Sequence, residues 1–118
     1  MNKAIEMVSD DLGISIREFT VAGITHDTLF AHHWYVGTDD AVDATDLRNR
    51  LDARLTELND DYAVERRHAL REVTVTVLPT ATFYRWMASK GKMGGQHKFP
   101  RVLTKGLIAE WGAFLAAA

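Results

Sequence analysis

The sequence predicts an α+β fold, in which a small sheet of three to four strands has helices packed on it. Two observations predict this class. Segments with apolar residues every three or four positions alternate along the chain with short runs rich in valine, isoleucine and aromatic residues. The length of 118 residues is normal for one domain with a real core. We therefore expect residues 1–118 to form a single domain.

The first quarter of the chain predicts one helix and two strands. Residues 2–12 place their apolar side chains on one helical face, and Gly13 follows as a helix end. Residues 14–24 predict a strand, and a slip in its apolar phase suggests a bulge or twist. Residues 29–37, LFAHHWYVG, are apolar at both odd and even positions, which is typical of a central strand covered on both faces.

The middle of the chain predicts two helices. Asp43 and Asp46 open the first, because acids in a first turn favour the positive end of the helix dipole. Its apolar stripe consists of Leu47, Leu51, Leu55 and Leu58. The following NDDYAVERRHA predicts a shorter helix capped by Asp60 or Asp61.

The last third predicts a strand and two further helices. REVTVTVLP alternates apolar and polar residues and ends at Pro79. Thr80 can cap a helix that carries three large apolar residues and stops at Gly91. The C-terminal helix is expected over about Thr104 to Ala117, where apolar residues recur on one face.

Charge is unevenly distributed along the chain. Arg85 to Lys105 contains six basic residues and no acid, and subtracting their charge from the net −2 leaves −8 on the remainder. Such an acidic body repels a long polyanion, whereas its basic patch can attract a small anion. Nucleic acid is therefore not an expected partner.

The chain carries no sign of export or membrane insertion. No apolar run approaches the roughly 20 residues that a membrane span needs, and acids occupy the place of a signal peptide's apolar stretch. The absence of cysteine excludes disulfides, thiol catalysis and cysteine-ligated zinc. We therefore expect a cytoplasmic protein without a membrane partner.

The basic segment SKGKMGGQHKFPRVLTK, residues 89–105, combines flexibility with donor groups. Gln96 can donate and accept hydrogen bonds, Lys98 offers a mobile point charge, and Arg101 offers a planar fork for carboxylate or phosphate. Three glycines permit close approach of the backbone to a ligand: Gly91, Gly94 and Gly95. Equally, the segment fits a solvated turn between two helices, since its glycines match neither common phosphate-loop motif.

Three motifs give the chain a family resemblance. LNDDYAVERR, ATFYRWM and GKMGGQHKFPR resemble the C-terminal domain of the auxin-responsive Gretchen Hagen family of acyl-acid amido synthetases, which are related to the firefly luciferase superfamily. The matching positions are Asn59, Tyr62, Arg66, Ala81, Thr82, Phe83, Gln96, Lys98, Pro100 and Arg101. Ala81 replaces the family's usual glycine. The family's large N-terminal domain, with its ATP-binding motifs, is absent from this sequence.

The resemblance implies a role in carboxylate activation. The family uses ATP and Mg²⁺ to form an acyl-adenylate and then transfers the acyl group to an amino acid, while the C-terminal domain moves as a lid between the steps. Lys98 would be the catalytic residue, because positive charge near phosphoryl oxygens assists such a step. Gly95, Gln96 and Arg101 would contact the nucleotide. Arg101 has an alternative role, which is to anchor the loop by pairing with an acid of its own domain.

Other polar residues favour structural roles. Asn59, Tyr62 and Arg66 share one helical face, and they are expected to tie helix to sheet rather than contact substrate. His32 and His33 must point to opposite faces of a strand, so they cannot grip one metal ion, and no metal site is expected. Three aromatic residues are expected in the core: Trp34, Trp86 and Trp111.

Two hypotheses remain open from the sequence. In the first, the chain is the lid domain of an adenylating amide ligase and is inactive alone, because the acid and nucleotide sites lie in a large N-terminal domain. In the second, the chain is a free-standing α+β module that binds an anionic ligand or a protein partner through its basic loop, without catalysis.

Overall fold

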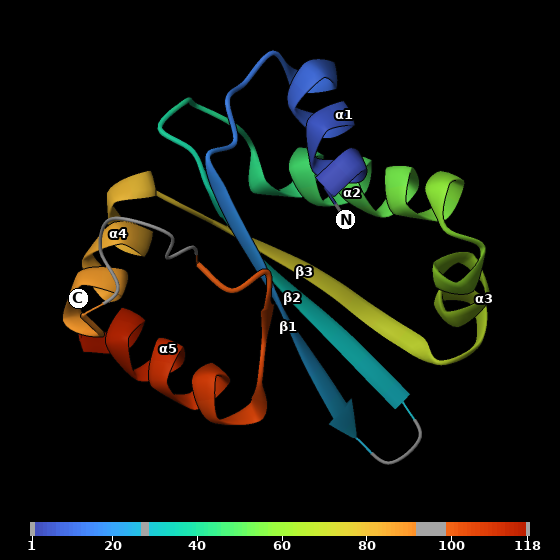
Figure 1. Cartoon of the computed structure of the whole chain (residues 1–118). Helices are drawn as coiled ribbons and strands as arrows, with labels where there is room; N and C mark the ends of the chain where they lie inside the picture. Colours follow the sequence, from blue (N-terminus) through green and yellow to red (C-terminus); the bar gives the residue numbers. More distant parts are fainter. Residues whose placement is uncertain (1, 27–28, 92–98, 118) are drawn as a thin grey trace.

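The computed structural model describes residues 2–26, 29–91 and 99–117, and it confirms the α+β class (Figure 1). In these residues the helices are α1 (Asn2–Leu12), α2 (Ala44–Leu58), α3 (Asp60–His68), α4 (Thr80–Ser89) and α5 (Lys105–Ala117). The strands are β1 (Glu18–His26), β2 (Leu29–Gly37), β3 (Leu70–Leu78) and β4 (Val102–Leu103). None of the helices in these ranges is long and apolar enough to cross a membrane.

The strands form one mixed sheet in the order β3-β2-β1-β4. β2 runs antiparallel to β1 and parallel to β3, and β4 runs parallel to β1. Trp34 of β2 lies opposite Val21 on one side and Val75 on the other. The prediction that residues 29–37 form a central strand is confirmed, whereas the two-residue edge strand β4 was not predicted.

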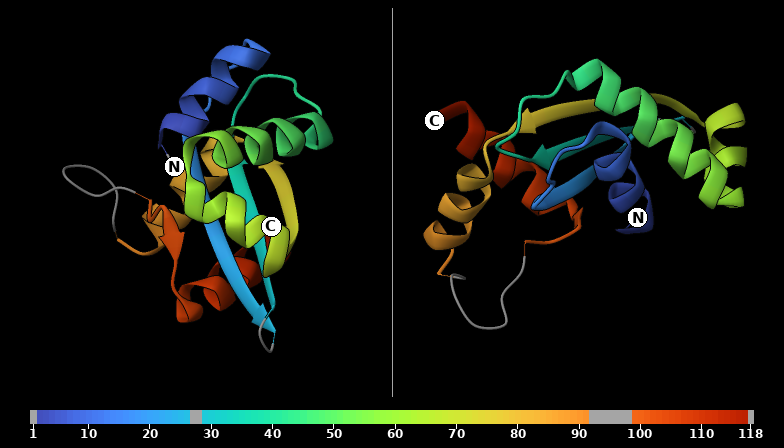
Figure 2. Two further views of the ribbon diagram at one scale, coloured as in Figure 1. Left: turned by 90° about the vertical axis from the view of Figure 1, so that its right-hand side faces the viewer. Right: turned by 90° about the horizontal axis from the view of Figure 1, so that it is seen from above.

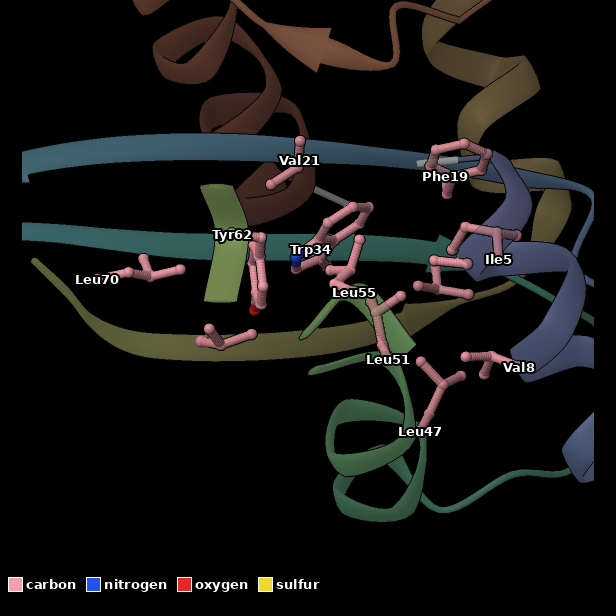
Figure 3. Close-up of a cluster of buried hydrophobic side chains, with 13 residues drawn as sticks. Ile5, Val8, Phe19, Val21, Trp34, Leu47, Leu51, Leu55, Tyr62 and Leu70 are labelled. Atoms are coloured by element: carbon pink, nitrogen blue, oxygen red, sulfur yellow. The ribbon is translucent and has the colours of Figure 1, made fainter. Parts of the chain in front are cut away.

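Helices cover both faces of the sheet (Figure 2). Side chains of successive strand residues alternate between faces, so Trp34 and Val36 of β2 point towards α1, α2 and α3, while Tyr35 points towards α4 and α5. The first cluster, between the sheet and α1–α3, is shown in Figure 3. Its buried members include Ile5, Val8, Phe19, Val21, Trp34, Leu47, Leu51, Leu55, Tyr62 and Leu70.

The second cluster lies between the opposite face and α4 and α5. Its buried residues are Ala22, Phe83, Trp86, Met87, Phe99, Leu103 and Trp111. All three tryptophans are therefore in the core, as predicted. One predicted core residue is not: Leu58, the last of the leucine stripe of α2, has 46% of its surface exposed.

Two predicted caps are wrong because other oxygens take their place. Asn59 caps α3, where its side-chain oxygen accepts a hydrogen bond from the backbone nitrogen of Tyr62 at 3.0 Å. The predicted caps Asp60 and Asp61 instead lie in the first turn, where they still favour the helix dipole. Asn59 also ends α2, so one residue serves both helices.

The N-terminus of α4 is capped from a different part of the chain. Thr80, the predicted cap, is the first helical residue and follows Pro79. Its backbone nitrogen donates to the carboxylate of Asp39, 3.0 Å away in the loop after β2. The hydroxyl of Thr80 is buried inside the fold, so the acid of a neighbouring loop replaces it as the capping group.

The start of β1 also differs from the prediction. Residues 14–17 lie outside the strand, which begins at Glu18, so the slip in apolar phase marks the strand's entry rather than a bulge. The register shift that the sheet does contain lies between Phe30 and Ala31, where β2 pairs with β3.

The two adjacent histidines of β2 lie on opposite faces, as predicted. His32 approaches Tyr62 on the α1–α3 side, with 6.3 Å between ring centroids. On the other face, His33 stacks on Tyr35, and its Nε2 lies 2.7 Å from the Thr76 hydroxyl oxygen. Burial lowers the pKa of both imidazoles, and Glu65 opposes this effect only at His32.

A first prediction uses two glycines of the sheet. A Cβ atom at Gly37 would lie 2.8 Å from Cε2 of Phe83 and 3.2 Å from Cβ of Glu18, whereas one at Gly23 would meet nothing within 4 Å. Because Phe83 is fully buried and cannot move aside, Gly37→Ala should lower the free energy of unfolding by about 1–3 kcal/mol. Urea unfolding measures this, and Gly23→Ala is the matched control. Equal stability of the two variants would contradict the packing described.

A second prediction concerns pH. With the pKa of His32 and His33 lowered in the native state, the unfolded chain binds protons below about pH 6.5 that the native state does not. Stability should therefore fall as the pH drops from above this value, and urea midpoints measured across the range report the loss.

Replacing both histidines with glutamine should flatten this pH dependence. His68→Gln is the control, because His68 is exposed on α3 and should leave the dependence in place. A pH profile of the double variant as steep as that of the original chain would refute the assignment.

Candidate functional site

The candidate site is the basic segment, residues 89–105, which runs from the end of α4 through β4 to the start of α5. Three of the predicted site residues, Gly95, Gln96 and Lys98, lie outside the described residues. The fourth, Arg101, lies within them and directly precedes β4. The structure therefore defines the two ends of the segment, and both ends are fixed to the fold.

The N-terminal end is fixed by α4 and α5. Gly91 adopts φ 68°, a left-handed conformation that glycine tolerates and that turns the chain out of α4. Beside it, the ammonium of Lys90 lies 2.6 Å from a carboxylate oxygen of Glu110 on α5. The same ammonium lies 5.6 Å from the centre of the Trp86 ring. The ammonium of Lys90 thus makes both of these contacts within its own domain.

The C-terminal end is fixed by an aromatic side chain. Phe99 has 2% of its surface exposed. Its ring centroid lies 4.9 Å from those of Phe83 and Trp111 and 5.0 Å from that of Trp86. The described part of the chain after residue 98 therefore begins at a side chain that is packed in the second cluster.

Arg101 closes the segment against β1. Its Nη1 lies 2.8 Å from a carboxylate oxygen of Glu18 and donates to the backbone oxygen of Phe19 at 3.1 Å. Its guanidinium lies 4.3 Å from the centre of the Phe19 ring. The backbone nitrogen of Val21 also donates to the carbonyl of Arg101 at 3.0 Å. This is the anchoring arrangement foreseen as one of two roles, and a contact of Arg101 with nucleotide stays a prediction.

The first of the three family motifs, LNDDYAVERR, lies mainly on α3 and ties that helix to α2 and to the start of β3. Arg66 donates from Nε to the carboxylate of Asp52 on α2 at 3.0 Å and from Nη1 to the carbonyl of Leu70 at the start of β3 at 2.9 Å. The hydroxyl of Tyr62 donates to the same carboxylate at 2.6 Å. Burial and the neighbouring Asp52 charge raise the pKa of Tyr62. With Asn59 as cap, these residues tie helix to sheet, as predicted.

Two partners in these contacts were not foreseen. Asp52 and Glu18 each accept bonds from an arginine that lies far away in sequence. In the sequence, Asp52 is an ordinary polar residue of a helix and nothing marks it as a partner of Arg66. Glu18 and Arg101 are too far apart in the sequence for any helix or strand spacing to connect them. In the part of the chain that the structure describes, no group of three or more His, Asp or Glu side chains could hold a metal ion.

Comparison with known proteins agrees with this architecture. Residues 1–106 match the GH3 family C-terminal domain. Comparison with curated proteins finds no match.

Two solved structures share the fold. One is a GH3.15 acyl acid amido synthetase, with a TM-score of 0.75 and 17% identity, and the alignment covers 98% of this chain and 22% of that one. The other is described as AtGH3.15 acyl acid amido synthetase in complex with 2,4-DB, with a TM-score of 0.70, 18% identity and the same coverage. The chain thus spans 22% of the length of either relative, and it belongs to the GH3 family, whose C-terminal domain it represents.

Proposed function

We propose that the chain is the C-terminal domain of an ATP-dependent acyl-acid amido synthetase, which activates a carboxylic acid by adenylation and joins it to an amino acid. The observation that carries the proposal is the family match over residues 1–106. It is supported by the likeness of fold to GH3.15 acyl acid amido synthetase over 98% of the chain. The name acyl acid amido synthetase describes the activity of the solved relative. We infer that the protein to which this chain belongs has the same kind of activity.

In this proposal Lys98 is the catalytic residue. Adenylation places negative charge on phosphoryl oxygens, and a fixed cation stabilises that charge most strongly where water is excluded. The anchors described above support the role, because Gly91 on one side and Phe99 on the other fix the ends of a glycine-rich connection. The glycines in this sequence fit a lysine that has to reach the phosphoryl region in one step of the proposed reaction and leave it in the other.

Gly95 and Gln96 are proposed to contact the nucleotide, Gly95 through its backbone and Gln96 through its amide. When bound, ATP would supply the adenylyl group that activates the acid, and pyrophosphate would be the leaving group. We propose that Mg²⁺ binds together with the nucleotide and is held mostly by the large N-terminal domain. Arg101 contributes first through its bond to Glu18, which holds the start of β4 against β1.

The remaining part of such an enzyme would supply the acid pocket and most of the nucleotide site. The two relatives are much longer than this chain, which covers 22% of each. We therefore expect the isolated 118-residue chain to bind no acid–adenylate and to show no ligase activity, and its proposed partner is a large adenylating domain.

A third prediction tests Lys98. In the complete enzyme, Lys98→Ala should lower ATP–pyrophosphate exchange by about 10²–10³-fold, because a preorganised positive charge is lost. Lys105→Ala is the matched control, since Lys105 belongs to the same basic segment but opens α5. The control should exchange at nearly the original rate.

Urea unfolding of both variants separates chemistry from folding, and neither substitution should alter stability appreciably. Unchanged exchange in the Lys98→Ala enzyme would reject the catalytic role. A similar loss of exchange in both variants would also contradict a specific role of Lys98. It would show that exchange depends only on the total positive charge of the segment.

A further inference from the structure

The strand β3 forms one edge of the sheet. Among the residues that the structure describes, the strand order ends at β3, so no further strand pairs with its outer side. Figure 2 shows this strand, drawn in yellow, on the outside of the sheet. β3 has nine residues, whereas β4 at the opposite edge has two. A long edge strand carries a row of backbone donors and acceptors with which another strand can pair.

The backbone groups of β3 alternate between the two sides of the strand. The carbonyl of Leu78 accepts a hydrogen bond from the backbone just beyond β2, at 3.1 Å, so it points into the sheet. The carbonyl of Val73 accepts a hydrogen bond from Nε of Arg48 on α2, at 2.8 Å, so it points outward. Because the direction alternates from one residue to the next, Val75 and Val77 also direct their N–H and C=O groups outward.

The middle of this edge lacks the features that usually prevent strand pairing. Natural edge strands are often protected by charged side chains, proline or bulges. The register shift between β2 and β3 lies at the start of β3 and leaves Arg71 as the extra residue. From Glu72 to Leu78 the pairing with β2 is regular, and residues 73–78, VTVTVL, carry no charge. The midpoint of the regular stretch is Val75.

A groove of about 370 Å³ lies beside the edge, between β3 and α2. Val73 and Val75 line it from the strand, and Ala44 and Thr45 line it from the helix. Because Ala44 and Thr45 are small, α2 leaves space beside the edge for the side chains of an added strand. Valine at every second position of that strand would fill the groove, and β3 itself has this pattern at residues 73, 75 and 77.

The charges at the two ends of β3 are opposite. Arg71 and Arg67 are exposed at the amino end. Beyond the carboxyl end lies Asp39, whose carboxylate accepts a hydrogen bond from the backbone nitrogen of Thr80 at 3.0 Å. Glu72 also lies at the amino end, but its side chain points to the face opposite α2. Antiparallel pairing about a two-fold axis places the amino end of one strand beside the carboxyl end of the other, so unlike charges meet twice.

We propose that β3 pairs antiparallel with β3 of a second copy of the chain, about a two-fold axis at Val75. Val73 then lies opposite the partner's Val77, and the two residues exchange backbone hydrogen bonds. The carbonyl of Val73 can keep its bond to Arg48, because a carbonyl oxygen has two lone pairs. The two sheets become one continuous sheet. The pairing uses no residue of the basic segment, so it does not depend on the proposed ligase function.

Sedimentation equilibrium of the 118-residue chain tests the proposal. A reversible dimer should form with a dissociation constant of about 1–100 µM, because one pair of strands makes a small interface. A chain that stays monomeric at concentrations well above this range would overturn the proposal. Species that grow beyond the dimer would also overturn it, because two-fold pairing uses up the β3 edge of both copies.

Val75→Pro tests the backbone hydrogen bonds at the axis. An edge strand tolerates proline where the N–H points away from the sheet, so the monomer should fold, which circular dichroism checks. The dissociation constant should rise about 10–100-fold, because the two symmetry-related hydrogen bonds at the axis are lost. Val75→Thr is the matched control, since it keeps the N–H and nearly the same shape, and it should dimerise like the original chain. Full dimerisation of a folded Val75→Pro variant would refute the pairing.

Arg71→Glu tests the charges and stays informative if the proline variant does not fold. It replaces two attractions to the partner's Asp39 with two repulsions, so the dissociation constant should rise about tenfold at low salt and less at high salt. Lys105→Glu is the control, because it makes the same change in charge beside Gly23, on the other edge strand pair. Equal effects of the two variants would contradict the assigned ends.

Cysteine cross-linking tests the register, since the chain has no cysteine of its own. With the axis at Val75, Thr74 lies opposite the partner's Thr76 in a non-hydrogen-bonded pair, with Cα atoms about 4.5 Å apart, which a disulfide can span. A mixture of Thr74→Cys and Thr76→Cys chains should therefore form mixed disulfide dimers faster than Thr74→Cys chains alone. It should also react faster than Lys105→Cys chains. The absence of this preference would refute the axis at Val75.

Discussion

The fold depends on the packing of aromatic rings around Trp111. This fully buried indole lies in the middle of the second cluster. It contacts aromatic rings from several elements on that side of the molecule: Tyr35 of β2, Phe83 and Trp86 of α4, Phe99 of the basic segment and Phe114 of α5. Edge-to-face and stacked pairs of this kind add to the free energy gained from burial. One side chain therefore couples both C-terminal helices to the sheet.

The same packing fixes the position of the C-terminal half of the basic segment, from Phe99 onwards. With Phe99 held in the second cluster and Arg101 bonded to Glu18, the chain re-enters the sheet at a defined point. These contacts fix the backbone from Phe99 onwards, whatever partner the basic segment has.

The elements were predictable where local periodicity determines them, and the long-range contacts were not. The leucine spacing of α2 and the two-sided apolar run of β2 identify their elements without reference to the rest of the chain. By contrast, α4 is capped by Asp39, which precedes Thr80 by 41 positions. Likewise β4 is held by Arg101 and its partner Glu18, 83 positions earlier. Spacing rules act within a few residues, so neither partner could be read from the sequence. The basic segment singled out Lys98 as a cation, its catalytic role came from the resemblance, and both its role and its environment stay predictions.

The position of Trp111 has a practical consequence for defining the domain. The family match ends at residue 106, whereas α5 continues to Ala117. A fragment cut at the end of the match would lack the indole around which the second cluster is built, and it would uncover the apolar rings of α4 and Phe99 to solvent. The family match is therefore shorter than the unit that packs around Trp111, and expression boundaries should include all of α5.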